Sequence, residues 1–157
     1  NTPITVVCSG AKIVLDLPST REWLETNGVC ILGWQCEEIP AFYSRKSGLK
    51  VDERIETAED VAQIIKSRDE LEMPNAILLT APVPEDFEVS SEKLDSILQS
   101  ALAEAESQNI LGKEITPFLL SKMSAMSKGE TLRANIALLE NNAKIAAQVA
   151  AAIASNK

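Results

Sequence analysis

The sequence predicts an α/β fold, a three-layer α/β/α sandwich with a mainly parallel sheet and a helical carboxyl-terminal third. Two observations carry this prediction. Short, apolar, β-branched runs alternate with segments of helical periodicity, as in chains built from βα units. The last third shows helical spacing alone. A chain of 157 residues fits one domain with a sizeable core.

Three short apolar runs are expected to form strands. They have the composition of strands buried on both faces of a parallel sheet. They cover residues 4–8, 29–34 and 75–80. The third run leads into Ala81-Pro82-Val83-Pro84, and neither proline has the amide hydrogen that ladder pairing needs. The third strand should therefore end at Thr80.

The segments between these runs are expected to be helical. Residues 11–17 can form a short helix that Pro18 would end, and Ser19 or Thr20 would cap a second helix that Gly28 closes. Residues 57–60 resemble a capping box with Asp in place of Glu, so a helix should begin there as well.

The pattern of the last third of the sequence predicts three helices. One covers residues 94–105, one is capped by Thr116 with Pro117 in its first turn, and a long alanine-rich helix starts at Glu130. Apolar residues recur along the long helix in steps of four and three, and we interpret this stripe as its core face. The stripe consists of Leu132, Ile136, Leu139, Ala143, Ala146, Ala150 and Ile153.

Composition excludes several classes of function. The net charge of −8 argues against a nucleic-acid polymer as partner, whereas a nucleotide monomer stays possible. Without histidine there is no Ser-His-Asp or Cys-His unit, so proton transfer falls to Lys, Asp, Glu or Tyr. Three cysteines without a Cys-x-x-Cys pair, and no apolar run of about 20 residues, predict a soluble, reduced, cytoplasmic protein without a membrane partner.

Lys12 is the principal candidate for chemistry. It follows the first predicted strand and the small residues Ser9, Gly10 and Ala11, and ligands of open α/β sheets collect beyond such strand ends. Its ammonium could pair with a phosphate, or its neutral amine could form an imine with a sugar aldehyde. The second role requires a pKa below the ordinary value of about 10.4. A solvated or ion-paired side chain is the alternative.

Two further groups of polar residues are weaker candidates. Asn135 lies beside the apolar stripe of the last helix, where it could bind a ligand or make hydrogen bonds between packed helices. Arg45, Lys46 and Lys50 form a basic cluster that could meet a phosphate or pair with carboxylates of this chain or of another subunit.

Five dispersed blocks resemble the pseudouridine-5′-phosphate glycosidase family, also called the indigoidine-synthase-A-like family. They occur in unbroken order over nearly the whole chain, which makes the set far more specific than any one block. The blocks are VCSGAK at 7–12, WLETNG at 23–28, PAFYSRKSG at 40–48, TPFLL at 116–120, and ANIAL at 134–138 with NNA at 141–143.

The resemblance implies a manganese-dependent homotrimer that reversibly splits the carbon–carbon glycosidic bond of pseudouridine 5′-phosphate into uracil and ribose 5-phosphate. Lys12 falls on the family's nucleophile, which forms an imine with the opened ribose. Asn135 falls on an asparagine expected to recognise uracil. Two positions depart from the family pattern: Ala81 replaces an asparagine, and Lys128 stands where a glycine is common.

The resemblance also implies that residues 1–157 are the carboxyl-terminal half of a single glycosidase-like domain. The family's proton-donating glutamate, a phosphate-contacting lysine and the aspartate that holds the metal fall upstream of the first strand. The isolated chain is therefore expected neither to bind Mn²⁺ at the family's site nor to turn over. Two alternatives stay open: a non-catalytic assembly or binding half, and an imine-forming enzyme that acts on another sugar phosphate.

Overall fold

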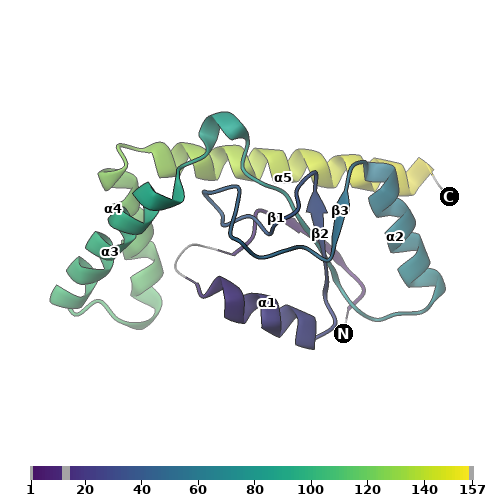
Figure 1. Ribbon diagram of the computed structural model, residues 1–157, viewed down its shortest axis with the longest axis horizontal. Helices are drawn as coiled ribbons and strands as arrows, with labels where there is room; N and C mark the ends of the chain where they lie inside the picture. Colours follow the sequence, from purple (N-terminus) through teal and green to yellow (C-terminus); the bar gives the residue numbers. More distant parts are fainter. Residues whose placement is uncertain (1, 12–14, 156–157) are drawn as a thin grey trace.

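A four-stranded sheet in the order β1-β4-β2-β3 organises the structure, and all of its neighbouring strands are parallel (Figure 1). The computed structural model describes residues 2–11 and 15–155. The strands are β1 (Thr5–Cys8), β2 (Cys30–Trp34), β3 (Glu53–Ile55) and β4 (Ile77–Thr80). Because β4 pairs with both β1 and β2, the carboxyl ends of these three strands meet at one edge of the sheet.

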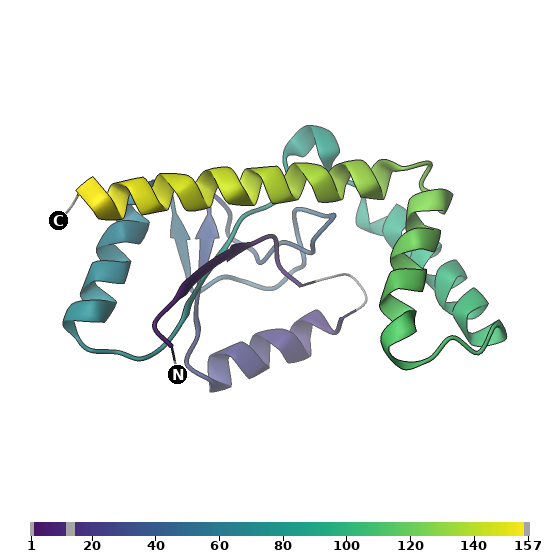
Figure 2. The ribbon, with the colours of Figure 1, turned by 180° about the vertical axis from the view of Figure 1, so that it is seen from behind.

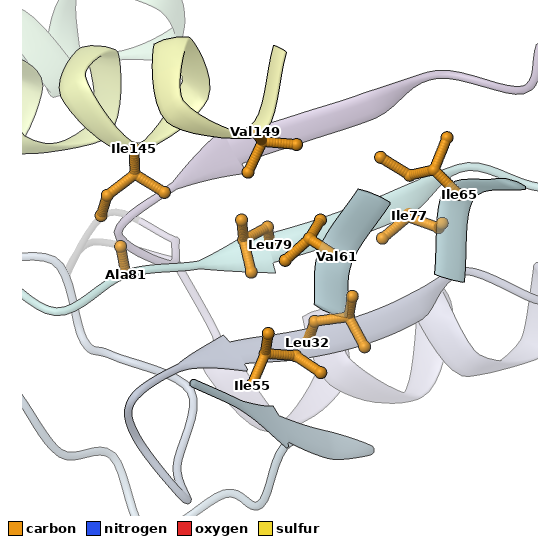
Figure 3. Packing of buried hydrophobic residues seen from close by; sticks show 9 residues of the cluster. All are labelled: Leu32, Ile55, Val61, Ile65, Ile77, Leu79, Ala81, Ile145 and Val149. Carbon is orange, nitrogen blue, oxygen red and sulfur yellow. The ribbon is translucent and has the colours of Figure 1, made fainter. Parts of the chain in front are cut away.

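Helices lie on both faces of the sheet, which confirms the predicted three-layer arrangement. Helix α1 (Leu17–Thr26) lies on one face, and helices α2 (Ala58–Glu70) and α5 (Glu130–Ser155) lie on the other (Figure 2). The main core fills the space between the sheet and the α2–α5 pair (Figure 3). Its buried residues are Leu32, Ile55, Val61, Ile65, Ile77, Leu79, Ala81, Ile145 and Val149.

A second core lies at the helical end, beyond the sheet. Helices α3 (Ser91–Ser107) and α4 (Ile115–Met126) pack against each other, and the first turns of α5 close this core. Short 3₁₀ turns, η1 (Glu85–Phe87) and η2 (Gly112–Glu114), precede α3 and α4. Among the helices of residues 2–11 and 15–155, none is long and apolar enough to cross a membrane.

Two predicted helix boundaries are confirmed by their hydrogen bonds. The Thr57 hydroxyl accepts a hydrogen bond from the Asp60 amide at 3.2 Å, and the Asp60 carboxylate accepts one from the Thr57 amide at 3.1 Å. This reciprocal capping box starts α2. Gly28 follows α1 with φ 67°, a conformation that glycine adopts without a Cβ penalty.

Three predicted helix boundaries were wrong. Pro18 lies in the first turn of α1 instead of ending a helix, because the amide that proline lacks has no intrahelical partner at that position. Asp16, and not Ser19 or Thr20, caps α1 by accepting a hydrogen bond from the Ser19 amide at 3.0 Å. Residues 12–14 of the predicted short helix fall outside the described residues. Thr116 caps nothing, since α4 already begins at Ile115, directly after η2.

Strand β3 was not predicted. It has only three residues, of which Glu53 and Arg54 are exposed and Ile55 alone is buried. A strand at the sheet edge needs no continuous apolar run, so its sequence carries little of the signal that marks the central strands.

The prediction for the core face of α5 was also wrong. Leu132, Ile136 and Leu139 are 52%, 50% and 58% exposed, and only Ile153 of the predicted stripe is substantially covered. The buried face is a neighbouring stripe that consists of Thr131, Ala134, Ala137, Leu138, Asn142, Ile145, Val149 and Ala152. This face includes Thr131 and Asn142, and these polar residues made it look less apolar than the exposed one.

Candidate functional site at the carboxyl edge of the sheet

The candidate site lies where β1, β4 and β2 end. Beyond Cys8 the chain turns through Ser9, Gly10 and Ala11. Gly10 has φ 81°, and a Cβ built on it would lie 1.8 Å from the Pro40 carbonyl oxygen. Only glycine therefore lets the end of β1 pass so close to the loop around Pro40. Ligands of open parallel sheets bind outside this edge of the strands.

Helix α5 is fastened to two of these strand ends by asparagine side chains. The Ser9 hydroxyl donates a buried hydrogen bond to Asn142 Oδ1 at 3.1 Å. Asn141 Nδ2 donates to the Pro82 carbonyl oxygen at 3.3 Å. The two bonds fix the middle of α5 over the ends of β1 and β4. Sequence analysis did not identify Ser9 or Asn142 as site residues, although both lie in the family-like blocks.

A loop of residues 39–46 encloses the site from another side. Its Phe42 amide donates a hydrogen bond to the Ser9 carbonyl oxygen at 3.0 Å. The Tyr43 ring is 3% exposed and packs edge-on against the Phe42 ring, with 4.8 Å between the ring centroids. Tyr43 thus anchors the loop in the second core, and the Phe42 hydrogen bond holds its backbone against the turn after β1.

Of the two predicted site residues, only Asn135 lies within the described part of the chain. Lys12 lies outside it, directly after Ala11, the last described residue of the turn beyond β1. Asn135 is half-buried on α5, and its side chain makes no hydrogen bond to any residue of the described ranges. It stands seven residues before Asn142 and so about 10 Å away along the helix axis, on the same side of α5.

Arg45 of the basic cluster is engaged by protein groups. Arg45 Nη1 donates to the Val83 carbonyl oxygen at 2.7 Å, and the Arg45 amide donates to the Glu88 carboxylate at 2.8 Å. Arg45 and Lys46 also line a cavity of about 270 Å³ beyond the ends of β2 and β4, which Glu37 and other residues of both charges share. Its mixed charge does not single out a phosphate site.

Burial sets the protonation of two groups near the site. It raises the pKa of the Cys8 thiol above its ordinary value of 9.0, and a weaker backbone hydrogen bond at Gly10 opposes the shift. Burial also raises the pKa of the Tyr43 phenol. Both groups therefore stay protonated at neutral pH, so Cys8 does not provide a thiolate nucleophile beside the turn.

The loop before α5 accommodates one of the departures from the family pattern. Lys128 adopts φ 52°, and Gly129 follows with φ 80°. Lys128 thus takes up the left-handed conformation that glycine would adopt freely, and the turn between α4 and α5 forms without a glycine there.

A metal ion finds no ready site among residues 2–11 and 15–155. No group of three or more His, Cys, Asp or Glu side chains converges there. The residues present therefore do not fit a manganese ion on their own, and no chemical step is assigned to one.

Comparison with known proteins identifies the family. Residues 1–152 match the family described as indigoidine synthase A like protein. The chain belongs to this family. A pseudouridine-5′-phosphate glycosidase of Caldanaerobacter subterraneus subsp. tengcongensis is 45% identical over 150 residues, which cover 96% of this chain and 49% of that relative. The Staphylococcus aureus enzyme of the same name is 43% identical, with 97% of this chain and 50% of that relative covered.

Two solved structures share the fold. The prealnumycin C-glycosynthase AlnA, in complex with ribulose 5-phosphate, superposes with a TM-score of 0.90 at 30% identity, covering 99% of this chain and 51% of that one. An indigoidine synthase A-like protein of Thermotoga maritima superposes with a TM-score of 0.86 at 38% identity, with the same coverage. The chain spans about half the length of the relatives that it matches.

Proposed function

We propose that this protein reversibly cleaves the carbon–carbon glycosidic bond of pseudouridine 5′-phosphate to uracil and ribose 5-phosphate. The observation that carries the proposal is the turn after β1, where Ser9 and Gly10 are fixed by α5 and the Pro40 loop and lead directly to Lys12. Two relatives that bear the name of this glycosidase support the reaction, and a C-glycosynthase neighbour bound to a sugar phosphate supports the substrate class.

In the proposed reaction, Lys12 supplies the nucleophile. Ordinary glycosidases protonate a leaving oxygen, but the base of pseudouridine is attached through carbon and offers no such atom. The neutral Lys12 amine would bond to C1′ while the bond from C1′ to the ring oxygen breaks and that oxygen takes up a proton. The lone pair of the amine nitrogen would then form an iminium with C1′ as the bond to uracil breaks, and the electron pair of that bond would stay on the uracil carbon. A separate acid would protonate the departing uracil carbon, and water would then hydrolyse the imine to release ribose 5-phosphate and restore the amine.

We assign recognition of the uracil base to Asn135. Its carboxamide can donate through nitrogen and accept through oxygen, and uracil presents both carbonyl acceptors and imide donors. Because Asn135 makes no hydrogen bond to a described residue, its amide is free to pair with a ligand. Asn142, by contrast, is engaged with Ser9.

We further propose that residues 1–157 form the carboxyl-terminal half of a cytoplasmic, homotrimeric, manganese-dependent enzyme. The chain covers about half of each relative, and its described residues contain no metal-binding cluster. The proton donor and the manganese ligand would then belong to the other half. A manganese titration of the isolated chain should give no tight stoichiometric binding, and tight binding would contradict this division.

A second candidate is an imine-forming enzyme that acts on another sugar phosphate. The observation that favours it is the neighbour AlnA, which is a C-glycosynthase and whose structure contains ribulose 5-phosphate. Both candidates use a lysine imine and differ in the partner of the new or broken carbon–carbon bond. A non-catalytic assembly half would use no imine at all.

Borohydride reduction tests the proposal directly. The full-length protein would be incubated with ribose 5-phosphate and reduced, and its peptides would be weighed by mass spectrometry. We expect a stable secondary amine on Lys12, and no adduct there in a Lys12→Arg variant. An adduct on another lysine would refute the role of Lys12, and absence of any adduct would support the non-catalytic half. Cleavage of pseudouridine 5′-phosphate then separates the glycosidase from the second candidate.

A further inference from the structure

Helix α5 carries an apolar surface that nothing in the described residues covers. We call it the outer face. It runs along one side of the helix for about 27 Å, given a rise of about 1.5 Å per residue. All of its residues are exposed, and no polar residue interrupts the series. They are Leu132, Ile136, Leu139, Ala143, Ala146 and Ala150.

The outer face continues onto the edge of the sheet. Strand β1 pairs with β4 on one side, and no described strand pairs with its other side. Thr5 and Val7 lie on the face of the strand that α5 covers, whereas the exposed Ile4 and Val6 lie on the opposite face of the sheet. A groove of about 280 Å³ connects the two surfaces, with Thr5 and Val7 of β1 on one side and Ala146 and Ala150 of α5 on the other.

An apolar helix face next to an unpaired strand edge is unusual on a surface that faces water. Free strand edges are normally shielded by charges, prolines or bulges, and β1 (Thr5–Cys8) has none of these. A helix whose apolar surface spans two neighbouring stripes is typically covered over both. Large contiguous apolar patches mark sites of interaction.

We propose that the outer face of α5 and the free edge of β1 together dock the amino-terminal half of the enzyme. The proposal rests on the division into halves made above, but not on the reaction. The matched relatives hold about as much chain again as the segment they share with this protein, so a partner of similar size exists for a surface of this length. That half would pack an apolar face against α5 and add a strand to the sheet beside β1.

The sheet favours this occupant over a second copy of the chain. A twofold axis would pair β1 with the β1 strand of the partner in antiparallel orientation. All described pairs in the sheet are parallel, and a strand that continues this pattern cannot be a copy of β1 related by a twofold axis. Docking that is mainly apolar should also depend little on salt.

The test is a binding experiment between two separate polypeptides. The probe is the part of the Caldanaerobacter relative that lies outside the match, co-expressed with the chain if it is insoluble alone. We expect a one-to-one complex by sedimentation velocity and new protection of the Thr5–Cys8 amides against hydrogen exchange. Ile136→Lys and Leu139→Lys should each weaken it at least about tenfold.

Leu111→Lys is the matched control, because Leu111 is 74% exposed and lies between α3 and η2, away from the outer face. It should bind like wild type. The proposal is wrong if no one-to-one complex forms or if Leu139→Lys binds unchanged. It is equally wrong if the chain self-associates through this face and Leu139→Lys returns it to a monomer. None of these outcomes depends on catalysis.

Discussion

The two sides of helix α5 are alike in composition and opposite in environment. The inner side, with Leu138 and Val149, is buried against the sheet and the helical end, whereas Leu132 and Leu139 on the outer face are exposed. The inner side also carries Asn142, whose partner Ser9 is buried. Apolar character alone therefore does not locate the core, and a hydrogen-bonded polar residue can mark the side that is packed.

The largest difference in stability should be found between variants of two neighbouring leucines. Leu138 is 1% exposed and Leu139 is 58% exposed. Leu138→Ala should lower the free energy of unfolding by about 2–5 kcal/mol because it leaves a cavity in the second core. Leu139→Ala should change it by no more than about 0.5 kcal/mol. Urea denaturation followed by circular dichroism measures both, and equal effects would mean that the outer face is covered in the isolated chain.

Asn142 and Asn135 allow the same comparison of a packed and an unpacked side chain at the candidate site. Asn142→Ala leaves the buried Ser9 hydroxyl without its partner, so it should destabilise the chain by about 1–3 kcal/mol. Asn135→Ala removes an amide without a protein partner among the described residues and should cost about 0.5 kcal/mol or less.

In the full-length enzyme the order of these two effects should reverse for binding, with Asn135→Ala raising KM for the nucleotide. Thermal unfolding and steady-state kinetics separate the two readouts. A large loss of stability in Asn135→Ala would show that its amide serves packing and not ligand recognition.

The smallest effect concerns the exposed start of α5. A hydrogen bond from Lys93 lowers the pKa of Glu130 below its ordinary value of 4.5. The lowered pKa means that this pair stabilises the fold above about pH 4.5, and that the contribution is lost as the pH falls through the lowered value. Glu130→Gln should therefore have a slightly lower urea midpoint at neutral pH and the same midpoint as wild type in acid. A difference that persists in acid would contradict the assignment.

Much of the fold could be predicted from the sequence, because its central strands and α2 have strong local signals. The runs at 4–8, 29–34 and 75–80 contain β1, β2 and β4, and the Thr57 capping box starts α2. Strand β3 was not predicted because an edge strand of three residues needs only one buried side chain. The sequence did not predict which side of α5 is buried, because both sides are apolar and only tertiary contacts determine which of them packs against the core.

The site was only partly predictable. A lysine after a strand and a small-residue turn can be found from the sequence, and so can a family-like asparagine at 135. The Ser9–Asn142 bond joins residues 133 positions apart and depends on how α5 crosses the sheet. The steric need for Gly10 likewise arises only when the Pro40 loop is in place.

The most direct test of the central claim measures uracil release from pseudouridine 5′-phosphate by the full-length enzyme supplied with Mn²⁺. The wild type should release uracil, should leave uridine 5′-phosphate intact, and should lose the activity in Lys12→Arg while keeping its unfolding midpoint. Uracil release at the wild-type rate by a correctly folded Lys12→Arg variant would contradict the account.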